Sequence, residues 1–397
     1  MADPSWDNGN YYGKDIPEKG LSLARMIGHI TYLSKESMDE KFGRERLEGM
    51  RKRLFNTDFQ VENYLNYQGK SFVERFDANS FLYITTAMDS FSLAEREDRL
   101  KDVFNRLKSR FLIISVTSDW LYPADQSKEL AENLLVSEKK ATYCDLASDY
   151  GHDSFLKKND DLSSLIFSFF SRTEEIDLEK LSRKDEIKDF QIISNMIKPS
   201  SRILDLGCGD GSFLSNMFKK GEISGHGIDI DINNIIKCNS KDVPVFQVDL
   251  DEGLEMIPDD FYDYTVLSRT LLEVHKPHLV LSEMLRVGKM GIVSFTNFAN
   301  WKNRIRLGLK GRLPISNELL FKWHNNPNIN YLSLKDFKQF CKENDILILE
   351  IFCIPEGTIS RILVCLGFCN LGADRVIIKI AKKRRDCEKI DSQKKCC

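Results

Sequence analysis

Short apolar runs recur through the second half of the sequence, and stretches with the apolar spacing of helices separate them. Runs that are apolar throughout and alternate with helices are typical of a parallel sheet covered by helices. The runs that we predict to be its strands are Ile203–Leu206, Gly225–Asp229, Val243–Asp249, Tyr262–Ser268 and Gly291–Phe295. Two later runs, Ile346–Ile354 and Asp374–Ala381, are expected to add an antiparallel edge. The pattern predicts a doubly wound α/β domain.

The first half of the sequence carries a weaker strand signal. Residues 21–34 have helical spacing, whereas 110–118 and 140–146 are short apolar runs that we predict to be buried parallel strands. Helical periodicity over 125–135 connects these two runs, and an apolar helix is expected at 162–170. The order strand, helix, strand predicts a βαβ unit, so this half is also expected to be α/β.

A change in composition near the middle of the chain separates the two halves. A chain of 397 residues suits two domains of ordinary size. Acidic and basic residues alternate with few large apolar ones over 172–189, which we interpret as a charged linker. We therefore predict domains at 1–171 and 190–382, followed by a basic, disordered tail at 383–397.

Bulk composition narrows the possible functions. The chain is 42% hydrophobic and 29% charged with a formal net charge of −3, which is ordinary for a globular protein and gives no general basic field for nucleic acid. The sequence has no N-terminal apolar leader and no apolar run long enough to span a membrane. We expect a cytoplasmic protein. The 10 cysteines form no CxxC pair, so we expect reduced, mostly buried thiols and no metal site.

A glycine-rich turn marks the candidate cofactor site. Gly207, Gly209 and Gly211 follow an apolar strand directly and precede an apolar helix. Glycine suits such a turn because the chain bends sharply there and a ligand can approach the backbone without meeting a Cβ atom. The alternative is that the glycines serve a tight turn only.

Acidic residues at three consecutive strand ends favour the ligand-binding alternative. Asp205 precedes the glycines, Asp229 ends the next strand where ribose hydroxyls would bind, and Asp249 ends the third, where an adenine amino group would bind. A dinucleotide site commonly has GxGxxG spacing, whereas this loop is GxGxG with Asp210 inside it. Because acids complement a sulfonium and an ammonium better than a diphosphate, we predict S-adenosylmethionine over a dinucleotide.

These motifs resemble the MetW family of methionine-biosynthesis proteins. The resemblance rests on Arg202–Gly211, Gly227–Asp231, Asp249–Leu254, Phe261–Tyr264, Leu267–Leu271, Glu283–Gly288, Val293–Phe298, Gly311–Pro314 and Trp323–Ile329. The later motifs are not general to methyltransferases, so the resemblance is specific. It implies a class I, S-adenosylmethionine-binding methyltransferase-type domain from about Lys184 to Lys382.

The sequence of this domain indicates no particular side chain as the catalyst of methyl transfer, because this reaction depends more on positioning of the methyl donor and acceptor than on a general base. Ser268 is expected at the cofactor. The residues that either line the acceptor side of the cleft or serve capping, surface or packing roles are Ser268, Arg269, His275, Asn297, Trp301, Arg304, Trp323 and His324.

Residues 1–170 resemble the C-terminal half of the homoserine O-acyltransferases, the MetX family, which has an α/β-hydrolase fold. The resemblance rests on Ala2–Trp6, Gly20–Leu33, Phe59–Leu65, Val116–Pro123 and Tyr150–Phe155. It implies that Asp119 and His152 are the orienting acid and the general base of a Ser–His–Asp triad; a structural Asp–His pair is the alternative. The sequence has no GxSxG, so the nucleophile is expected either from a partner, which is the nucleophile half or a full-length acyltransferase, or from a segment upstream of Met1 in a longer fused gene. Homoserine and an acyl-CoA would bind through that partner, and a homodimer is also possible.

Two alternatives come from other classes of protein. The first is a non-catalytic regulator that senses S-adenosylmethionine and binds a homoserine O-acyltransferase. The second is membrane attachment through the tail, since Lys382–Arg385 and Cys396–Cys397 resemble a polybasic, double-cysteine lipidation site. The resemblance of the rest of the chain to biosynthetic proteins favours no membrane partner.

Overall fold

The computed structural model describes residues 1–47, 59–93, 97–171, 184–221, 223–311 and 329–383. The chain divides into two compact units, Met1–Ser164 and Leu165–Cys397, and each is described by itself. The predicted tail from 384 onward, Trp323 and His324 lie outside the described residues. So does the predicted linker up to residue 183.

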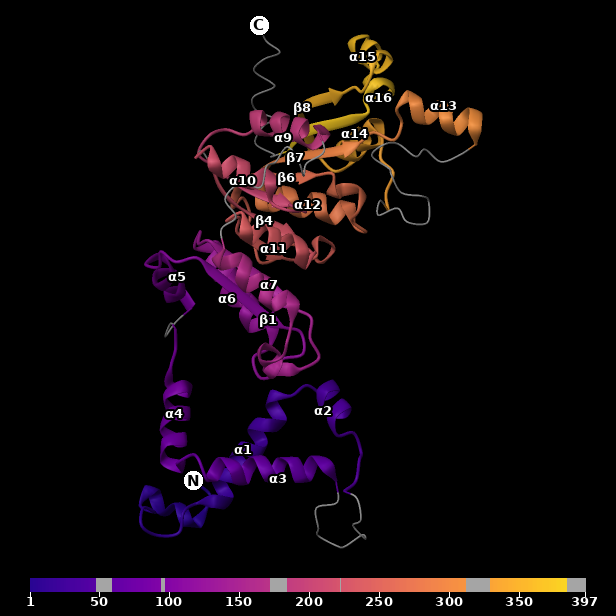
Figure 1. The fold of residues 1–397 in the computed structure, drawn as a ribbon. Helices are drawn as coiled ribbons and strands as arrows, with labels where there is room; N and C mark the ends of the chain where they lie inside the picture. The colour runs from indigo at the N-terminus through magenta and orange to yellow at the C-terminus, as the bar shows by residue number, and fades with distance from the viewer. Residues whose placement is uncertain (48–58, 94–96, 172–183, 222, 312–328, 384–397) are drawn as a thin grey trace. The chain divides into compact units, whose positions relative to one another are not determined.

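The N-terminal unit begins with short helices and continues with a small parallel strand pair (Figure 1). Its helices before the strands are η1 (Pro4–Gly9), α1 (Glu18–Tyr32), α2 (Lys35–Lys41), α3 (Gln60–Val73), α4 (Ala78–Ser90) and α5 (Glu97–Asn105). Helices α1 and α3 pack against each other. A small buried core contains Tyr11, Leu21 of α1 and Ala78 of α4, and Phe72 of α3 packs against it.

The predicted βαβ unit is present. Strand β1 (Phe111–Val116), helix α6 (Ala124–Val136) and strand β2 (Ala141–Leu146) follow one another, and the two strands pair in parallel. Helix η2 (Gly151–Leu156) comes next, and α7 (Asp160–Phe170) completes the segment. This confirms the order that the sequence predicted.

The C-terminal unit is built on a mostly parallel sheet. Within it the strands lie in the order β5-β4-β3-β6-β7-β9-β8. The strands are β3 (Ser201–Leu206), β4 (Ile223–Asp229), β5 (Val245–Gln247), β6 (Tyr262–Ser268), β7 (Gly288–Thr296), β8 (Ile346–Ile354) and β9 (Arg375–Lys382). Strand β9 runs antiparallel to both β7 and β8, which confirms the antiparallel edge, and the other strand pairs are parallel.

Helices cover this sheet (Figure 1). They are α9 (Lys184–Met196), α10 (Ser212–Lys219), α11 (Ile232–Ser240), η3 (Leu250–Glu252), η4 (Thr270–Leu272), α12 (Pro277–Val287), α13 (Trp301–Lys310), α14 (Leu334–Glu343), α15 (Thr358–Cys365) and α16 (Cys369–Gly372). The chain leaves β3 toward β4 and later returns to β6 on the other side of β3. The adjacent ends of β3 and β6 are therefore the switch point where such sheets bind ligands.

Several strands begin or end a few residues away from the predicted bounds, and two further differences have an identifiable cause. Strand β5 is shorter than Val243–Asp249, because Pro244 offers no N–H to a ladder and Asp249 instead caps the short helix η3. The last part of the predicted linker, from Lys184, belongs to helix α9, where Asp189 is buried by ion pairs described below.

Among the described residues, none of the helices has the length and apolar content needed to cross a membrane. Within the same residues, no group of three or more His, Cys, Asp or Glu side chains is arranged to hold a metal ion.

Strands β3 and β4 pack so closely at Gly225 of β4 that a side chain there would clash with the backbone of β3. A Cβ atom at Gly225 would lie 2.0 Å from the carbonyl oxygen of Ile203, its partner in β3. Backbone cannot move aside cheaply, so Gly225→Ala should lower the free energy of unfolding by more than about 2 kcal/mol. Hydrogen exchange of the β3 and β4 amides would measure this loss.

The matched control is Gly308→Ala in helix α13, where an added Cβ meets nothing within 4 Å. Alanine favours a helix over glycine, so this variant should be unchanged or more stable by up to about 1 kcal/mol. Equal effects of the two substitutions would contradict the clash.

Candidate functional site

The turn between β3 and α10 holds its glycines in the left-handed region of backbone space. Gly207, Gly209 and Gly211 have φ angles of 71°, 55° and 72°. A Cβ at Gly207 would meet Thr270 Oγ1 at 2.3 Å, whereas a Cβ at Gly209 would meet nothing within 4 Å. Gly207 is therefore needed for packing as well as for φ, while Gly209 borders open space.

Asp229, at the end of β4, is bonded to this turn. Its Oδ2 accepts the Gly209 N–H at 2.8 Å. Its Oδ1 accepts the Asp231 N–H at 3.0 Å and the Asn234 side-chain amide at 3.1 Å. The carboxylate thus holds the glycine turn, which is carried on a different strand, in a single position.

Asp205, the last but one residue of β3, is a buried acid beside this arrangement. Its exposed fraction is 3%. Burial, and then the negative charge of Asp229, raise the pKa of Asp205 to about 7. Partial burial and Asp229 also raise the pKa of Glu273, a residue that the sequence reasoning missed. The cleft therefore gathers carboxyl groups whose negative charges disfavour one another.

Asp210, expected from the sequence to face a cationic ligand, is neutralised by the protein. Lys241 Nζ lies 2.6 Å from Asp210 Oδ2, and the Ser212 N–H donates to Oδ1 at 3.0 Å. Burial disfavours the Asp210 carboxylate, but these hydrogen bonds outweigh it and lower its pKa. Its charge serves to fix the start of α10.

The third predicted acid, Asp249, caps helix η3 by accepting the Asp251 N–H at 2.9 Å. Asp251 in turn accepts the backbone N–H of His275 at 2.9 Å and lies 3.2 Å from His275 Nδ1. The pKa of Asp251 is lowered, because the N–H groups of His275 and Lys276 outweigh the cost of burial. These contacts join the ends of β5 and β6.

These residues enclose a cleft of about 960 Å³ at the switch point of the sheet. Of the predicted site residues, those that line it are Asp205, Gly207, Gly209, Asp229, Asp249, Ser268, Arg269 and His275. Gly211 is not part of the lining; a Cβ there would lie 2.8 Å from Cys238 Sγ, so its role is packing.

Ser268 and Arg269, on the β6 side of the cleft, are bonded to neighbouring elements. The Ser268 hydroxyl lies 3.1 Å from that of Ser294. Arg269 donates to Asp189 Oδ2 at 2.8 Å, and Arg375 Nε lies 3.3 Å from Asp189 Oδ1. Asp189 is 1% exposed, so helix α9 reaches the cleft through a buried ion pair. The charged composition around Asp189 concealed this role, because both arginines come from distant strands.

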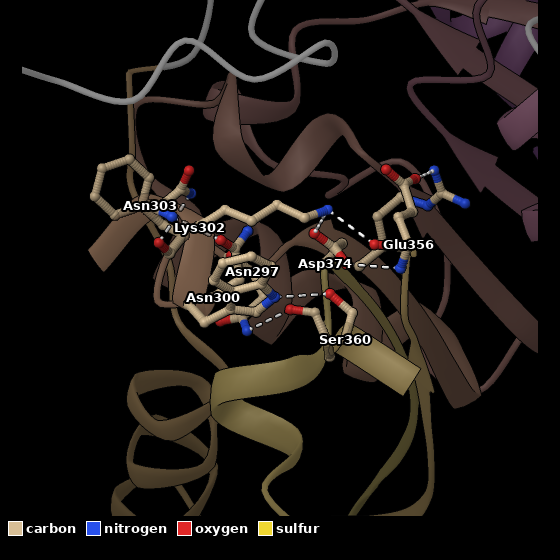
Figure 2. A network of polar contacts seen from close by, with 11 residues as sticks. Asn297, Asn300, Lys302, Asn303, Glu356, Ser360 and Asp374 are labelled. Atoms are coloured by element: carbon tan, nitrogen blue, oxygen red, sulfur yellow. Dashed lines mark hydrogen bonds and ion pairs between the residues drawn. The ribbon is translucent and has the colours of Figure 1, made fainter. Parts of the chain in front are cut away.

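Asn297, Trp301 and Arg304 do not line the cleft. They lie at and after the end of β7, where Asn297 belongs to a network of polar contacts (Figure 2). The fully buried Asn297 donates to the carbonyl of Ala373 at 2.8 Å and accepts the Leu334 N–H at 3.2 Å. The Trp301 indole donates to Ser360 at 3.0 Å, and Arg304 donates to the carbonyl of Ala299. This confirms the packing alternative for these three residues.

The same network joins helix α13 to the loop before α15. Lys302 Nζ lies 2.8 Å from Asp374 Oδ1, and Asp374 Oδ2 accepts the Glu356 N–H (Figure 2). Asn300 caps α13 by accepting the Asn303 N–H at 2.9 Å. The polar groups of this network form hydrogen bonds and ion pairs with one another, so the network serves to connect these elements of the fold.

In the N-terminal unit, the structure brings Asp119 and His152 together. His152 Nδ1 lies 2.9 Å from Asp119 Oδ2, while Asp119 Oδ1 accepts the backbone N–H groups of Leu121 and Tyr122 at 2.9 and 3.0 Å. The Asp119 side chain is 8% exposed and that of His152 is 29% exposed. The acid is therefore held in place while the imidazole reaches solvent.

Aromatic rings and one glycine position this histidine. The ring centroids of Tyr122, Phe155 and Tyr32 lie 5.3, 5.6 and 5.7 Å from that of His152. A Cβ at Gly151, which has φ 67°, would lie 2.6 Å from the Ser34 backbone nitrogen. The sequence reasoning missed Gly151; the only signal was a glycine directly before the histidine.

A hollow of about 410 Å³ lies beside this pair. Its lining includes Ser118 and Trp120, which flank Asp119, and Leu33 and Met38 from the helical segment. The Trp120 indole donates to the carbonyl of Leu33 at 3.2 Å. The helices before β1 therefore cover part of the Asp–His site.

Comparison with known proteins finds a matching family model and similar sequences. Residues 187–377 match the family model described as methionine biosynthesis protein MetW. The C-terminal unit carries a MetW-family domain. A protein of Rhodopirellula baltica described as bifunctional methionine biosynthesis protein MetXA/MetW is 35% identical over 400 residues, which are 97% of this chain and 64% of that protein.

Homoserine O-acetyltransferases are also similar to the chain. The one from Methanococcus vannielii is 47% identical over 195 residues, covering 49% of this chain and 38% of that protein. The one from Methanobrevibacter ruminantium is 51% identical over 182 residues, 45% of this chain and 37% of that protein. The chain thus spans less than two thirds of the length of these relatives.

Solved structures show low overall similarity. A SAM-dependent methyltransferase from Archaeoglobus fulgidus has a TM-score of 0.37 at 19% identity and covers 52% of this chain and 97% of that chain. Homoserine O-acetyltransferase from Bacillus anthracis has a TM-score of 0.34 at 24% identity and covers 38% and 40%.

The buried acid of the MetW-family cleft predicts an unusual pH dependence of stability. Between pH 3.8, the ordinary pKa of an aspartate, and about 7, folded Asp205 holds a proton that the unfolded chain has lost. The free energy of unfolding should therefore fall as pH rises through this window. Asp205→Asn should remove the loss and be more stable than the natural chain at pH 8, by as much as about 4 kcal/mol.

Hydrogen exchange of β3 and β6 amides at pH 5 and pH 8 would measure this difference. Asp263→Asn is the control of opposite sign, because the N–H of Arg202 and the ammonium of Lys289 outweigh burial and lower the pKa of Asp263. Its contribution is present above pH 3.8 and is lost as pH falls further, so Asp263→Asn should destabilise the unit at pH 8. An Asp205→Asn variant without any gain at pH 8 would contradict the account.

Proposed function

We propose that the C-terminal unit binds S-adenosylmethionine in the cleft between the ends of β3, β4 and β6. The observation that carries the proposal is the hydrogen bond from the Gly209 N–H to Asp229, beside open space. It holds Gly209, which has no side chain, next to a carboxylate that still has an unused lone pair, because three of its roughly four acceptor positions are occupied. A ribose hydroxyl suits that position.

The charges of the cleft support a cationic ligand. Burial, and then the negative charge of Asp229, raise the pKa values of Asp205 and Glu273, and a bound positive charge would relieve the repulsion among these acids. Sulfonium and ammonium groups supply such a charge. Leu250, directly after Asp249, adds a buried apolar surface that suits an adenine ring. The residues available to the cofactor are thus those that the sequence singled out, without Gly211 and with Glu273 added.

When bound, S-adenosylmethionine supplies an activated methyl group, and the domain is then a methyltransferase-type enzyme. A second candidate is a non-catalytic sensor of S-adenosylmethionine that regulates a homoserine O-acyltransferase. One observation favours the sensor: Ser268, Arg269 and His275, which line the cleft, are each bonded to another residue of the protein. Incubation with radiolabelled cofactor and cell extract separates the two, since only an enzyme transfers label.

For the N-terminal unit we propose a part in acyl transfer to the hydroxyl of homoserine. Asp119 fixes the imidazole of His152 through Nδ1, which leaves Nε2 to accept a proton from an attacking hydroxyl. Residues 1–397 contain no GxSxG nucleophile turn, so the serine and the oxyanion hole would come from residues outside this range, which a nucleophile half or a full-length acyltransferase would supply together with the acyl-CoA. Both proposals belong to methionine biosynthesis, the process that the description of the MetW family names.

The first prediction from this function concerns the ribose acid. Asp229→Ala removes charge-assisted hydrogen bonds and the support of the Gly209 N–H, so S-adenosylmethionine binding should weaken by about 2–3 kcal/mol. Titration calorimetry on the full chain measures it. Glu343→Ala, which removes an acid of helix α14 outside the cleft, should bind normally. Gly209→Val should also abolish binding while the unit stays folded, and unchanged affinity in that variant would show that no ligand approaches the turn.

A further prediction concerns acyl transfer. The full chain by itself should not acylate homoserine, because an Asp–His pair without a nucleophile cannot form an acyl-enzyme. Co-expression with a nucleophile half from the same genome should produce activity that His152→Ala reduces at least about 1000-fold. His278→Ala, on the exposed surface of α12, is the control. Strong activity of the chain alone would overturn the split arrangement.

A further inference from the structure

The thiols of Cys208 and Cys238 meet beneath the glycine turn of the cofactor cleft. Cys208 lies in the turn itself and Cys238 in helix α11, and their sulfur atoms are 3.8 Å apart. Both thiols point at the carbonyl oxygen of Gly209, which is 3.3 Å from Cys238 Sγ and 3.8 Å from Cys208 Sγ. The pair therefore contacts the residue whose N–H is held by Asp229.

Glycines make the room in which this pair sits. A Cβ at Gly227 would lie 2.5 Å from Cys208 Sγ, and a Cβ at Gly211 would lie 2.8 Å from Cys238 Sγ. The sulfur atoms thus occupy space that is free because Gly211 and Gly227 have no side chains. They lie close enough for a small shift to bring them within bonding distance of each other. Cys208 lines the cleft, whereas Cys238 has no exposed surface.

We propose that Cys208 and Cys238 form a redox-modification site in which a hydroperoxide converts the two thiols into a disulfide and thereby closes the cofactor cleft. This inference rests on the proposed binding of S-adenosylmethionine. The hydroperoxide first oxidises Cys208 to a sulfenic acid and is reduced to the alcohol, or to water if it is hydrogen peroxide. The Cys238 sulfur then displaces hydroxide from the sulfenic sulfur, so that the S–S bond forms and one water leaves.

The disulfide would change the turn. An S–S bond is about 2.05 Å long, so the sulfurs must approach by well over 1 Å, and Gly209 is in contact with both. The Gly209 N–H would then leave its position on Asp229, and the cleft would lose the backbone surface proposed to face the cofactor. Conversely, a bound cofactor would cover Cys208 and protect it.

Access controls the rate of this reaction. The hydrogen bond to Cys238, then burial, raise the pKa of the Cys208 thiol, so the reactive thiolate is scarce and oxidation is slow even in the empty cleft. A bound cofactor would in addition cover Cys208, which lines the cleft. We therefore expect slow oxidation in the presence of cofactor and faster oxidation without it.

The test uses the full chain, hydrogen peroxide and S-adenosylmethionine. Non-reducing peptide mapping should find a Cys208–Cys238 link that forms several times more slowly when the cofactor is present. The linked protein should bind S-adenosylmethionine at least about tenfold more weakly, as expected for loss of one charge-assisted hydrogen bond, and dithiothreitol should restore binding.

Cys238→Ala should bind normally and keep its affinity after peroxide treatment. Cys341→Ala, which removes a buried thiol of helix α14, should remain as sensitive as the natural chain. If Cys238→Ala fails to fold, Cys208→Ala serves to show that the link is lost.

The outcomes separate this inference from the function on which it rests. A reduced chain that binds S-adenosylmethionine but forms no Cys208–Cys238 link overturns the inference alone. A link that leaves affinity unchanged, or a Cys238→Ala chain that still loses affinity on oxidation, overturns it as well. A reduced chain without affinity for the cofactor overturns the proposed function, and with it the closing of the cleft.

Discussion

The cleft of the C-terminal unit depends on one hydrogen bond, from the Gly209 N–H to the carboxylate of Asp229. A left-handed glycine turn has many conformations open to it, because glycine has no Cβ to restrict φ and ψ. Binding a ligand to a mobile turn would cost the entropy of fixing it. The carboxylate of the neighbouring strand pays that cost in advance by accepting the amide, so the turn is already ordered when a ligand arrives.

This arrangement imposes an electrostatic constraint on the rest of the cleft. Burial, and then the negative charge of Asp229, disfavour a second carboxylate at Asp205, and the pKa of Asp205 rises to about 7 as a result. Where a further acid was needed nearby, a cation accompanies it: Lys241 neutralises Asp210, and Arg269 neutralises Asp189. Among the described residues, the acids at the cleft that have no such cation beside them include Asp205, Asp229 and Glu273. The cleft therefore carries negative charge that a cationic ligand would balance.

Local patterns were enough to predict the strands, the turn and the acids at strand ends, because each depends on residues close together in sequence. The failures come from partners that are distant. Asp210 was expected to face a ligand, yet Lys241, 31 residues away, captures it. Asp189 looked like part of a solvated linker, yet Arg269, which directly follows β6, and Arg375, the first residue of β9, converge on it and bury it. Pro244, which shortens β5, is the exception, since its effect is local and was overlooked.

The two units use the same local device for different chemistry. Asp119 and Asp229 both come at or just after the end of a parallel strand, and in each a carboxylate Oδ1 accepts a backbone N–H of the turn that follows. This fixes the rotamer, so Oδ2 points in one direction, to His152 Nδ1 in one unit and to the Gly209 N–H in the other. Because the turn, and not the partner, sets the direction, the acid is oriented before its partner arrives. An aspartate held in this way can orient an imidazole for proton transfer or a backbone turn for ligand contact, and the partner alone decides which.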